Sequence, residues 1–205
     1  MRDLDRALAD ITAIRSQMAR GTQFRGYGAV TIATTGLLTI LAGGAQALLL
    51  PEPAADIGGY LILWIVVAAV SAIMIGVEMV ARARRMHSGL ADEMLYTAVE
   101  QFMPAAVAGT LLTVVLVRSA PQSVWMLPGL WQIIFALGVF ASCRTLPRPI
   151  FAAGAWYLAA GLADLMFAHG DNALSPWSMA VPYGIGQLYI AAVLYRSVGA
   201  HDGDA

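Results

Sequence analysis

The sequence contains no lysine, a single cysteine and few charged residues. Only 12% of its 205 residues are charged and 59% are apolar, whereas roughly 25% of the residues of a soluble domain are charged. The lone Cys143 excludes a disulfide within the chain. Twelve arginines nearly balance thirteen acids, for a net charge of −1. The chain therefore lacks a basic surface that would neutralise phosphates, and we expect no nucleic-acid binding.

Motifs of the common catalytic classes are also missing. The sequence has no HExxH for a metalloprotease, no GxSxG for a serine hydrolase and no GxxxxGK[ST] for nucleotide phosphates. We therefore predict no cofactor, and the missing motifs count against an enzyme.

What the sequence has instead is six long apolar runs. They extend over about 27–50, 58–81, 99–117, 127–143, 150–168 and 177–195. Helices of these lengths rise about 25–36 Å, which matches a hydrocarbon layer of about 30 Å. Most connections are short and contain Pro or Gly, so neighbouring helices should run in opposite directions. The sequence predicts an all-α fold, a polytopic membrane bundle of six transmembrane helices over 26–198.

The first 25 residues have a different pattern. Apolar residues recur there at helical spacing, while the opposite face mixes acids and bases. This predicts a cytoplasmic amphipathic helix over 1–25 that is retained and not cleaved as a signal. Because its polar face is not Arg-rich, the helix suits packing on protein better than lying on anionic lipid. That protein could be its own bundle, a cytoplasmic regulatory protein or a second copy in a homo-oligomer.

The arginines are distributed unequally between the two sides of the predicted bundle. With the N-terminus inside, eleven of the twelve are cytoplasmic and only Arg118 is outside. The positive-inside rule then places both termini in the cytoplasm, including the tail over 199–205. We expect a bacterial inner membrane, with the lipid bilayer as the main partner. In this topology His87 and His169 lie on opposite sides, and no histidine pair can hold a haem near the midplane.

Charged side chains gather at the cytoplasmic ends of the second and third spans. Glu78 precedes Arg82 by four residues, the favourable order for an ion pair within one helix. The cluster comprises Glu78, Arg82, His87, Glu93 and Glu100. It is either a salt-bridge network or a proton or cation site, in which Glu78, His87 and Glu100 could also bind a divalent metal. Pro104 should kink the third helix, because it cannot donate to the Glu100 carbonyl.

A second polar group is expected near the outer boundary. Gln132 and Gln187 lie four and five residues inside Pro128 and Pro182, which we expect to open their helices. The candidate ligand-binding residues are Gln46, Tyr60, Trp131, Gln132, Asp164 and Gln187. They could line an outward-facing pocket for a small apolar or amphipathic ligand. Alternatively, they form hydrogen bonds between helices, with Arg118 neutralising Asp164.

Three stretches carry a resemblance to a known family. MHSGLADEMLYTAVEQFMPA (86–105), MLPGLWQIIFALGVFASCRTLPRP (126–149) and ALSPWSMAVPYGIGQL (173–188) resemble a family of uncharacterised six-span inner-membrane proteins of proteobacteria. The resemblance covers nearly the whole chain and implies the same bundle and location. It implies no activity, cofactor or site residue. The occurrence of such proteins beside winged-helix regulators favours signalling.

Three functions are compatible with these observations. The first is a small sensor or regulatory scaffold, in which the outer pocket takes a ligand and the N-terminal helix reaches a cytoplasmic partner. The second is a small transporter or channel subunit, with Glu78, Glu100 and Asp164 as a discontinuous path. The third is an intramembrane enzyme that acts on a lipid through Asp and Glu without a recognisable motif.

Overall fold

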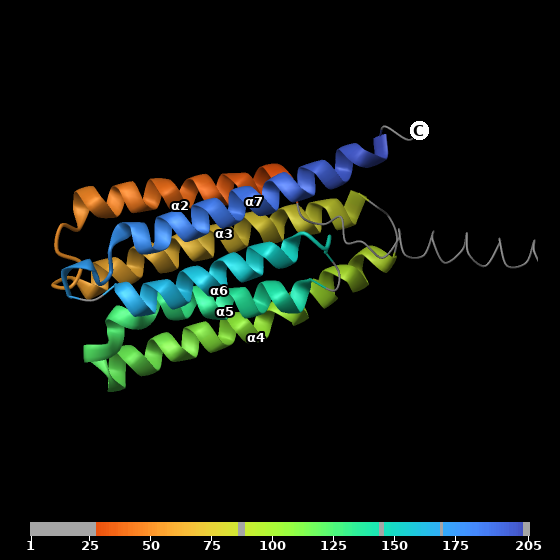
Figure 1. Cartoon of the computed structure of the whole chain (residues 1–205). Coiled ribbons are helices and arrows are strands. Elements are labelled where there is room, and N and C mark those ends of the chain that lie inside the picture. Colours follow the sequence, from red (N-terminus) through yellow and green to blue (C-terminus); the bar gives the residue numbers. More distant parts are fainter. Residues whose placement is uncertain (1–27, 86–88, 144–145, 169, 203–205) are drawn as a thin grey trace, which may run out of the picture.

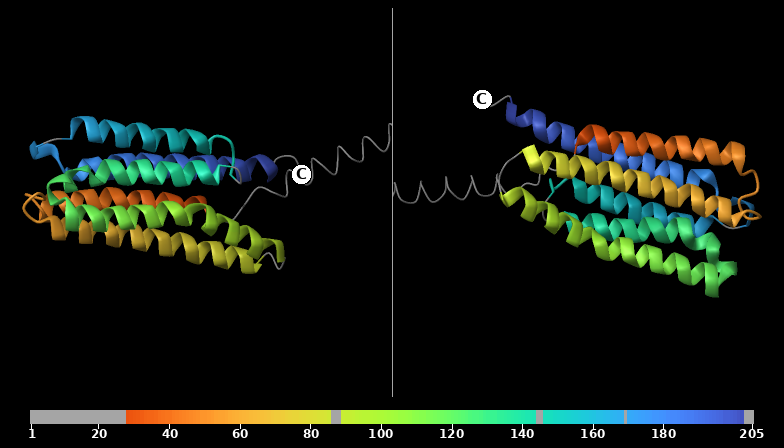
Figure 2. Two further views of the ribbon diagram at one scale, coloured as in Figure 1. Left: turned by 90° about the horizontal axis from the view of Figure 1, so that it is seen from below. Right: turned by 180° about the vertical axis from the view of Figure 1, so that it is seen from behind.

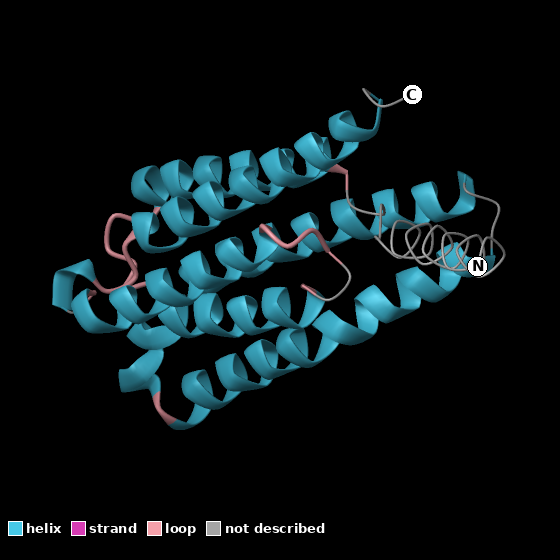
Figure 3. Cartoon of the chain, turned by 45° about the vertical axis from the view of Figure 1, so that its right-hand side comes forward, coloured by secondary structure: helices cyan, strands magenta, loops and turns pink. Residues whose placement is uncertain are grey.

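The computed structural model describes residues 28–202 except 86–88, 144–145 and 169. The predicted helix over 1–25 lies outside the described residues. Every element in the described part is a helix (Figure 3). The elements are α2 (Ala29–Leu49), α3 (Ile57–Arg85), α4 (Gly89–Ser119), η1 (Pro121–Met126), α5 (Leu127–Ser142), α6 (Ile150–Phe167), η2 (Gly170–Asn172) and α7 (Pro176–Asp202). Six segments are long and apolar enough to cross a membrane, which confirms the predicted polytopic bundle.

The helices lie side by side and form a closed bundle (Figures 1 and 2). Around it, α2 contacts α3, α4 contacts α5, α5 contacts α6 and α6 contacts α7, while α7 packs closely on α2. The first and last spans are therefore neighbours. Helix α2 begins, and α7 ends, at the end of the bundle where α3 leads to α4 (Figure 1).

Two helix pairs approach closely because glycine stands at the contact. A Cβ added to Gly161 of α6 would lie 2.6 Å from the carbonyl oxygen of Gly129 in α5. Between α2 and α7, a Cβ added to Gly36 would lie 3.0 Å from the Cβ of Gln187. Small residues of this kind let helix backbones pack where lipid gives no hydrophobic drive for association.

Aromatic side chains fill the interior of the bundle between α5, α6 and α7. Phe135 of α5 meets Tyr157 of α6 and Tyr183 of α7, with ring centroids 4.8 and 5.3 Å apart. Tyr60 and Trp64 of α3 are buried against α2 and α7. By contrast, no residue in the apolar window of α4 (99–119) is buried. Helix α4 therefore lies at the edge of the bundle.

Two prolines lie inside helices. Helix α7 begins at Pro176 and continues through Pro182, so the expectation that Pro182 opens the last span is wrong. Gln187 is consequently eleven residues, or about 16 Å along the helix axis, from the first residue of its helix, and not five residues from it as expected. Helix α4 likewise continues through Pro104. A membrane helix tolerates such a proline where other groups satisfy the freed carbonyl.

Candidate functional site

Gln46 joins three parts of the chain near the end of the bundle at which α2 ends. Its side chain is fully buried. The Gln46 Nε2 donates to the carbonyl oxygen of Leu174 at 2.8 Å, and its Oε1 accepts from the Trp64 indole at 2.7 Å. Leu174 has a positive φ of 60°, so the bond fixes an uncommon backbone conformation in the α6–α7 connection. Gln46 therefore acts as a link between helices in this structure.

Gln132 compensates for the proline in α7. Because Pro182 has no backbone N–H, the carbonyl of Ser178, four residues earlier, loses its helical donor. The Nε2 of Gln132 on α5 donates to that carbonyl at 2.7 Å. The amide thus replaces the missing backbone bond and ties α5 to α7. The sequence contained the signal, since a proline within an apolar run frees the carbonyl four residues before it.

The Gln132 bond can be tested against the proline that makes it necessary. We expect Gln132→Leu to lower the free energy of unfolding by about 1–3 kcal/mol, because the Ser178 carbonyl is left buried and unpaired. In a Pro182→Ala background the same substitution should cost less, since the restored backbone N–H can serve Ser178. Unfolding in detergent of the four proteins of this cycle measures the coupling. Equal costs in both backgrounds would contradict the compensation.

Asp164 connects this bond to a buried polar cluster. It lies in the last turn of α6, and its carboxylate accepts a hydrogen bond from the Ser178 hydroxyl. Tyr60 on α3 is near enough to interact electrostatically with Asp164. The Tyr60 hydroxyl and the Gln132 Oε1 are buried and have no hydrogen-bond partner in the described part of the chain. Three of the six predicted binding residues, Tyr60, Gln132 and Asp164, are therefore brought together around Ser178.

No cation neutralises Asp164 among the residues that the structure describes. Arg118 is exposed near the end of α4, and the single ion pair found in the described chain joins Glu78 to Arg82. The expected Arg118–Asp164 pairing is therefore wrong, because α4 and α6 lie on either side of α5 and Asp164 faces α7.

Of the other three predicted binding residues, Gln46 makes the contacts described above, and Trp131 and Gln187 contact other helices. The Trp131 indole donates to the Thr113 hydroxyl at 2.8 Å and so joins α5 to α4. Gln187 is buried where α7 packs on Gly36 of α2. The candidate residues therefore do not share one layer, because Gln187 lies further along its helix than expected.

A shallow and largely open groove between α6 and α7 was not anticipated from the sequence. It has a volume of about 410 Å³, and Asp164 is its only lining residue among those predicted. Polar groups in its lining come from Asp164, Asn172, Ser175 and Ser178, and the remaining lining residues include Trp156 and Trp177. A smaller hollow of about 140 Å³ follows along the same helix pair and shares Trp156. The Trp156 indole donates to the Pro182 carbonyl at 2.9 Å across the seam.

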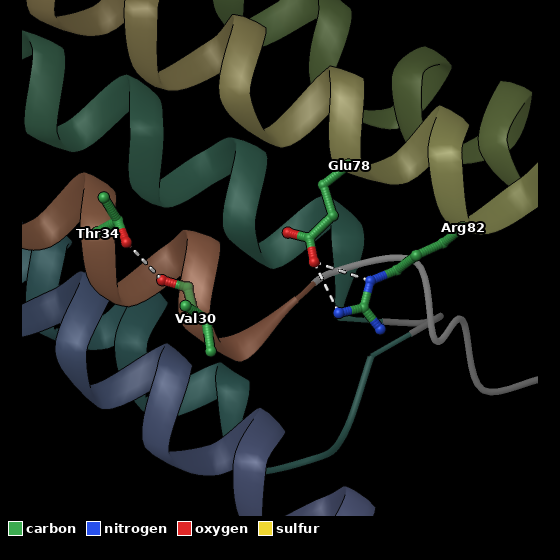
Figure 4. A network of polar contacts seen from close by, with 4 residues as sticks. All are labelled: Val30, Thr34, Glu78 and Arg82. Carbon is green, nitrogen blue, oxygen red and sulfur yellow. Dashed lines mark hydrogen bonds and ion pairs between the residues drawn. The ribbon is translucent and has the colours of Figure 1, made fainter.

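At the opposite end of the bundle, Glu78 caps a neighbouring helix. The carboxylate accepts from Arg82 Nε and Nη2 at 2.9 and 2.6 Å, which confirms the predicted pair (Figure 4). It also accepts from the Thr31 hydroxyl and the Gly28 backbone. Gly28 is the N-cap of α2 and has no side-chain cap of its own. An acid from α3 therefore accepts from one backbone group at the start of α2 and lies at the positive end of its dipole.

Other members of the cluster that the sequence predicts on the cytoplasmic side are not seen to join this contact. Glu100 is exposed on α4. The side chains of His87 and Glu93 lie outside the described residues, so the cation or metal site stays a prediction. Cys143, just after α5, is partly buried, and burial raises the pKa of its thiol. A thiol that stays protonated is a poor nucleophile and metal ligand.

Comparison of the chain with protein-family models, with curated proteins and with solved structures found no match in any of the three.

Proposed function

We propose that this integral membrane protein is a sensor of a small amphipathic molecule that binds in the α6–α7 groove. The observation that carries the proposal is Asp164, an acid without a counter-cation among the described residues, placed in a groove with apolar and aromatic walls. A concave, mostly apolar surface with a few convergent polar groups is the usual form of a small-molecule site. A polar head can meet Asp164 while an apolar part contacts the walls.

The groove supports binding better than the interior site suggested by the sequence. Gln46 and Trp131 use their polar atoms on other helices and loops. Because these atoms are already hydrogen-bonded between parts of the bundle, they stabilise the fold and are not available to a ligand. The groove, in contrast, is open to the surroundings of the protein, and its aromatic residues Phe167 and Trp177 are 75% and 56% exposed.

The other two hypotheses receive less support. A transport path would need its acids in sequence across the membrane. Glu78 accepts hydrogen bonds at the start of α2, Glu100 is exposed on α4, and Asp164 faces α7. The three acids therefore do not line one path. Acid–base catalysis by a pair of groups would need a second titratable side chain at the groove surface. Asp164 is the only titratable side chain in the lining that the structure describes, and Tyr60 is buried behind it.

A ligand in the groove would have a route to the other end of the bundle. A ligand that displaces the Ser178–Asp164 hydrogen bond would move Ser178, whose carbonyl accepts a hydrogen bond from Gln132. The movement would therefore reach α5, α6 and α7. Helix α7 is packed closely on α2, and α2 starts at the Glu78 cap. The proposed output is a cytoplasmic regulatory protein, reached at that end of the bundle in a bacterial inner membrane.

Filling the groove should remove the ligand. Ala160 lines it, and Ala160→Leu adds bulk where the ligand would lie. We expect the amount of an amphipathic molecule that co-purifies with the protein, measured by mass spectrometry, to fall about tenfold, which corresponds to roughly 1.4 kcal/mol of binding. Ala108→Leu, on the exposed face of α4, is the matched control and should leave recovery unchanged. The proposal fails if no amphipathic molecule is enriched with the wild type over Ala160→Leu.

A further inference from the structure

The charge of the groove selects among amphipathic ligands. Its described lining contains one acid, Asp164, and no basic residue. One hydrogen bond from Ser178 occupies only part of the carboxylate, which offers about four lone-pair sites. The dipole of α6 disfavours a negative charge at its C-terminal turn, and the dipole of α7 favours one at its first turn, so the two effects on this carboxylate oppose each other. Because no basic residue of the described lining neutralises Asp164, its carboxylate should attract a cation.

The polar groups of the lining other than Asp164 carry no charge. Asn172, Ser175 and Ser178 can each donate or accept a hydrogen bond. Asp164 is thus the only charged side chain that the described lining presents to the head of a ligand. An ammonium head supplies N–H donors and a positive charge to it, whereas an anionic head would be repelled.

The walls suit both the head and the apolar part of such a ligand. Trp156, Phe167 and Trp177 line the groove, and aromatic faces attract ammonium groups through their quadrupoles. The smaller hollow beyond Trp156 is lined by Ala152, Ile185 and other mostly apolar residues. From Asp164 to Ala152 is twelve residues of α6, or about 18 Å. That distance is slightly more than half of a hydrocarbon layer of about 30 Å, the reach of one acyl chain.

We infer that the ligand is a single-chain organic cation, with its ammonium head at Asp164 and its chain along the α6–α7 seam past Trp156. This inference rests on the proposed function and adds the chemical class of the ligand. An ammonium group also occurs in lipids with an ethanolamine head. Such a lipid carries a phosphate, which would face Asp164 with no basic residue in the described lining to balance it. A free amine therefore fits better than a phospholipid.

The inference is tested with three probes that share chain length and differ in head. Dodecylamine, 1-dodecanol and a lysophosphatidylethanolamine with a twelve-carbon chain are titrated against the full chain in neutral-lipid nanodiscs, with native mass spectrometry as the readout. We expect dodecylamine to bind most tightly. Asp164→Asn should weaken that binding about tenfold or more, the effect of losing a charged hydrogen-bond partner. Glu100→Gln, which removes an equal charge from exposed α4, should leave it unchanged.

The outcomes separate this inference from the proposed function. Retained binding of 1-dodecanol by Asp164→Asn would show that the variant is folded and that its groove is intact. If Asp164→Asn binds dodecylamine as the wild type does, or if the lysophospholipid binds more tightly than the amine, the cation assignment is overturned while the groove remains a binding site. If none of the three probes binds the wild type, the proposed function is overturned as well.

Discussion

Replacing Gly161 with leucine is expected to destabilise the protein by at least about 3 kcal/mol, the upper part of the range for overpacking. A Cβ at this position would lie 2.6 Å from the carbonyl oxygen of Gly129. The obstacle is backbone, which cannot move aside as a flexible side chain can. Helices α5 and α6 must therefore separate, which also disturbs the Gln132 bond that leaves α5 for α7.

Gly44 provides the control for this prediction. It lies inside α2 and has open space within 4 Å of the added Cβ. We expect Gly44→Leu to change stability by no more than about 1 kcal/mol, and in the stabilising direction, because leucine has the higher helix propensity. Thermal unfolding of both variants in the same detergent gives the comparison. Similar losses of stability in the two variants would mean that the α5–α6 contact is not the cause.

The second large effect is expected at Gln46. Gln46→Leu conserves much of the side-chain volume but leaves the Trp64 indole N–H and the Leu174 carbonyl without their partner. Interhelical hydrogen bonds in membrane proteins average about 0.6 kcal/mol each. A buried group left unpaired costs about 1–3 kcal/mol. Because two groups are orphaned at once, we expect a loss of about 2 kcal/mol.

Gln187→Leu is the matched control, since it exchanges the same residue types in a buried position. The structure gives Gln187 no hydrogen bond to another described residue, so its replacement should be near neutral. Unfolding measurements on the two variants distinguish a specific link from a general intolerance of leucine. Tryptophan fluorescence should also shift in Gln46→Leu and not in Gln187→Leu, because only Gln46→Leu removes the hydrogen-bond acceptor of the Trp64 indole. Equal destabilisation by both substitutions would rule out the Gln46 link.

The site could be anticipated only in part. The sequence indicated that Tyr60, Gln132 and Asp164 are polar groups in apolar spans, and the structure brings them together around Ser178. It gave no sign of the groove, because a gap between α6 and α7 depends on how far apart those helices lie. Gln187 lies further from the start of its helix than the sequence predicts, because α7 begins at Pro176 and not at Pro182. That proline lies inside α7 because Gln132, on a different helix, satisfies the carbonyl that it frees.

The sequence by itself determined the six spans and the Glu78–Arg82 pair. Both follow from short-range properties, since apolar length measured against bilayer thickness defines a span and a spacing of four residues defines a pair on one helix. Only the tertiary structure decided that Asp164 faces Ser178 and not Arg118, and that Glu78 caps α2. Those contacts depend on how each helix is rotated and which helix is its neighbour, and close packing at small residues such as Gly129 and Gly161 fixes both.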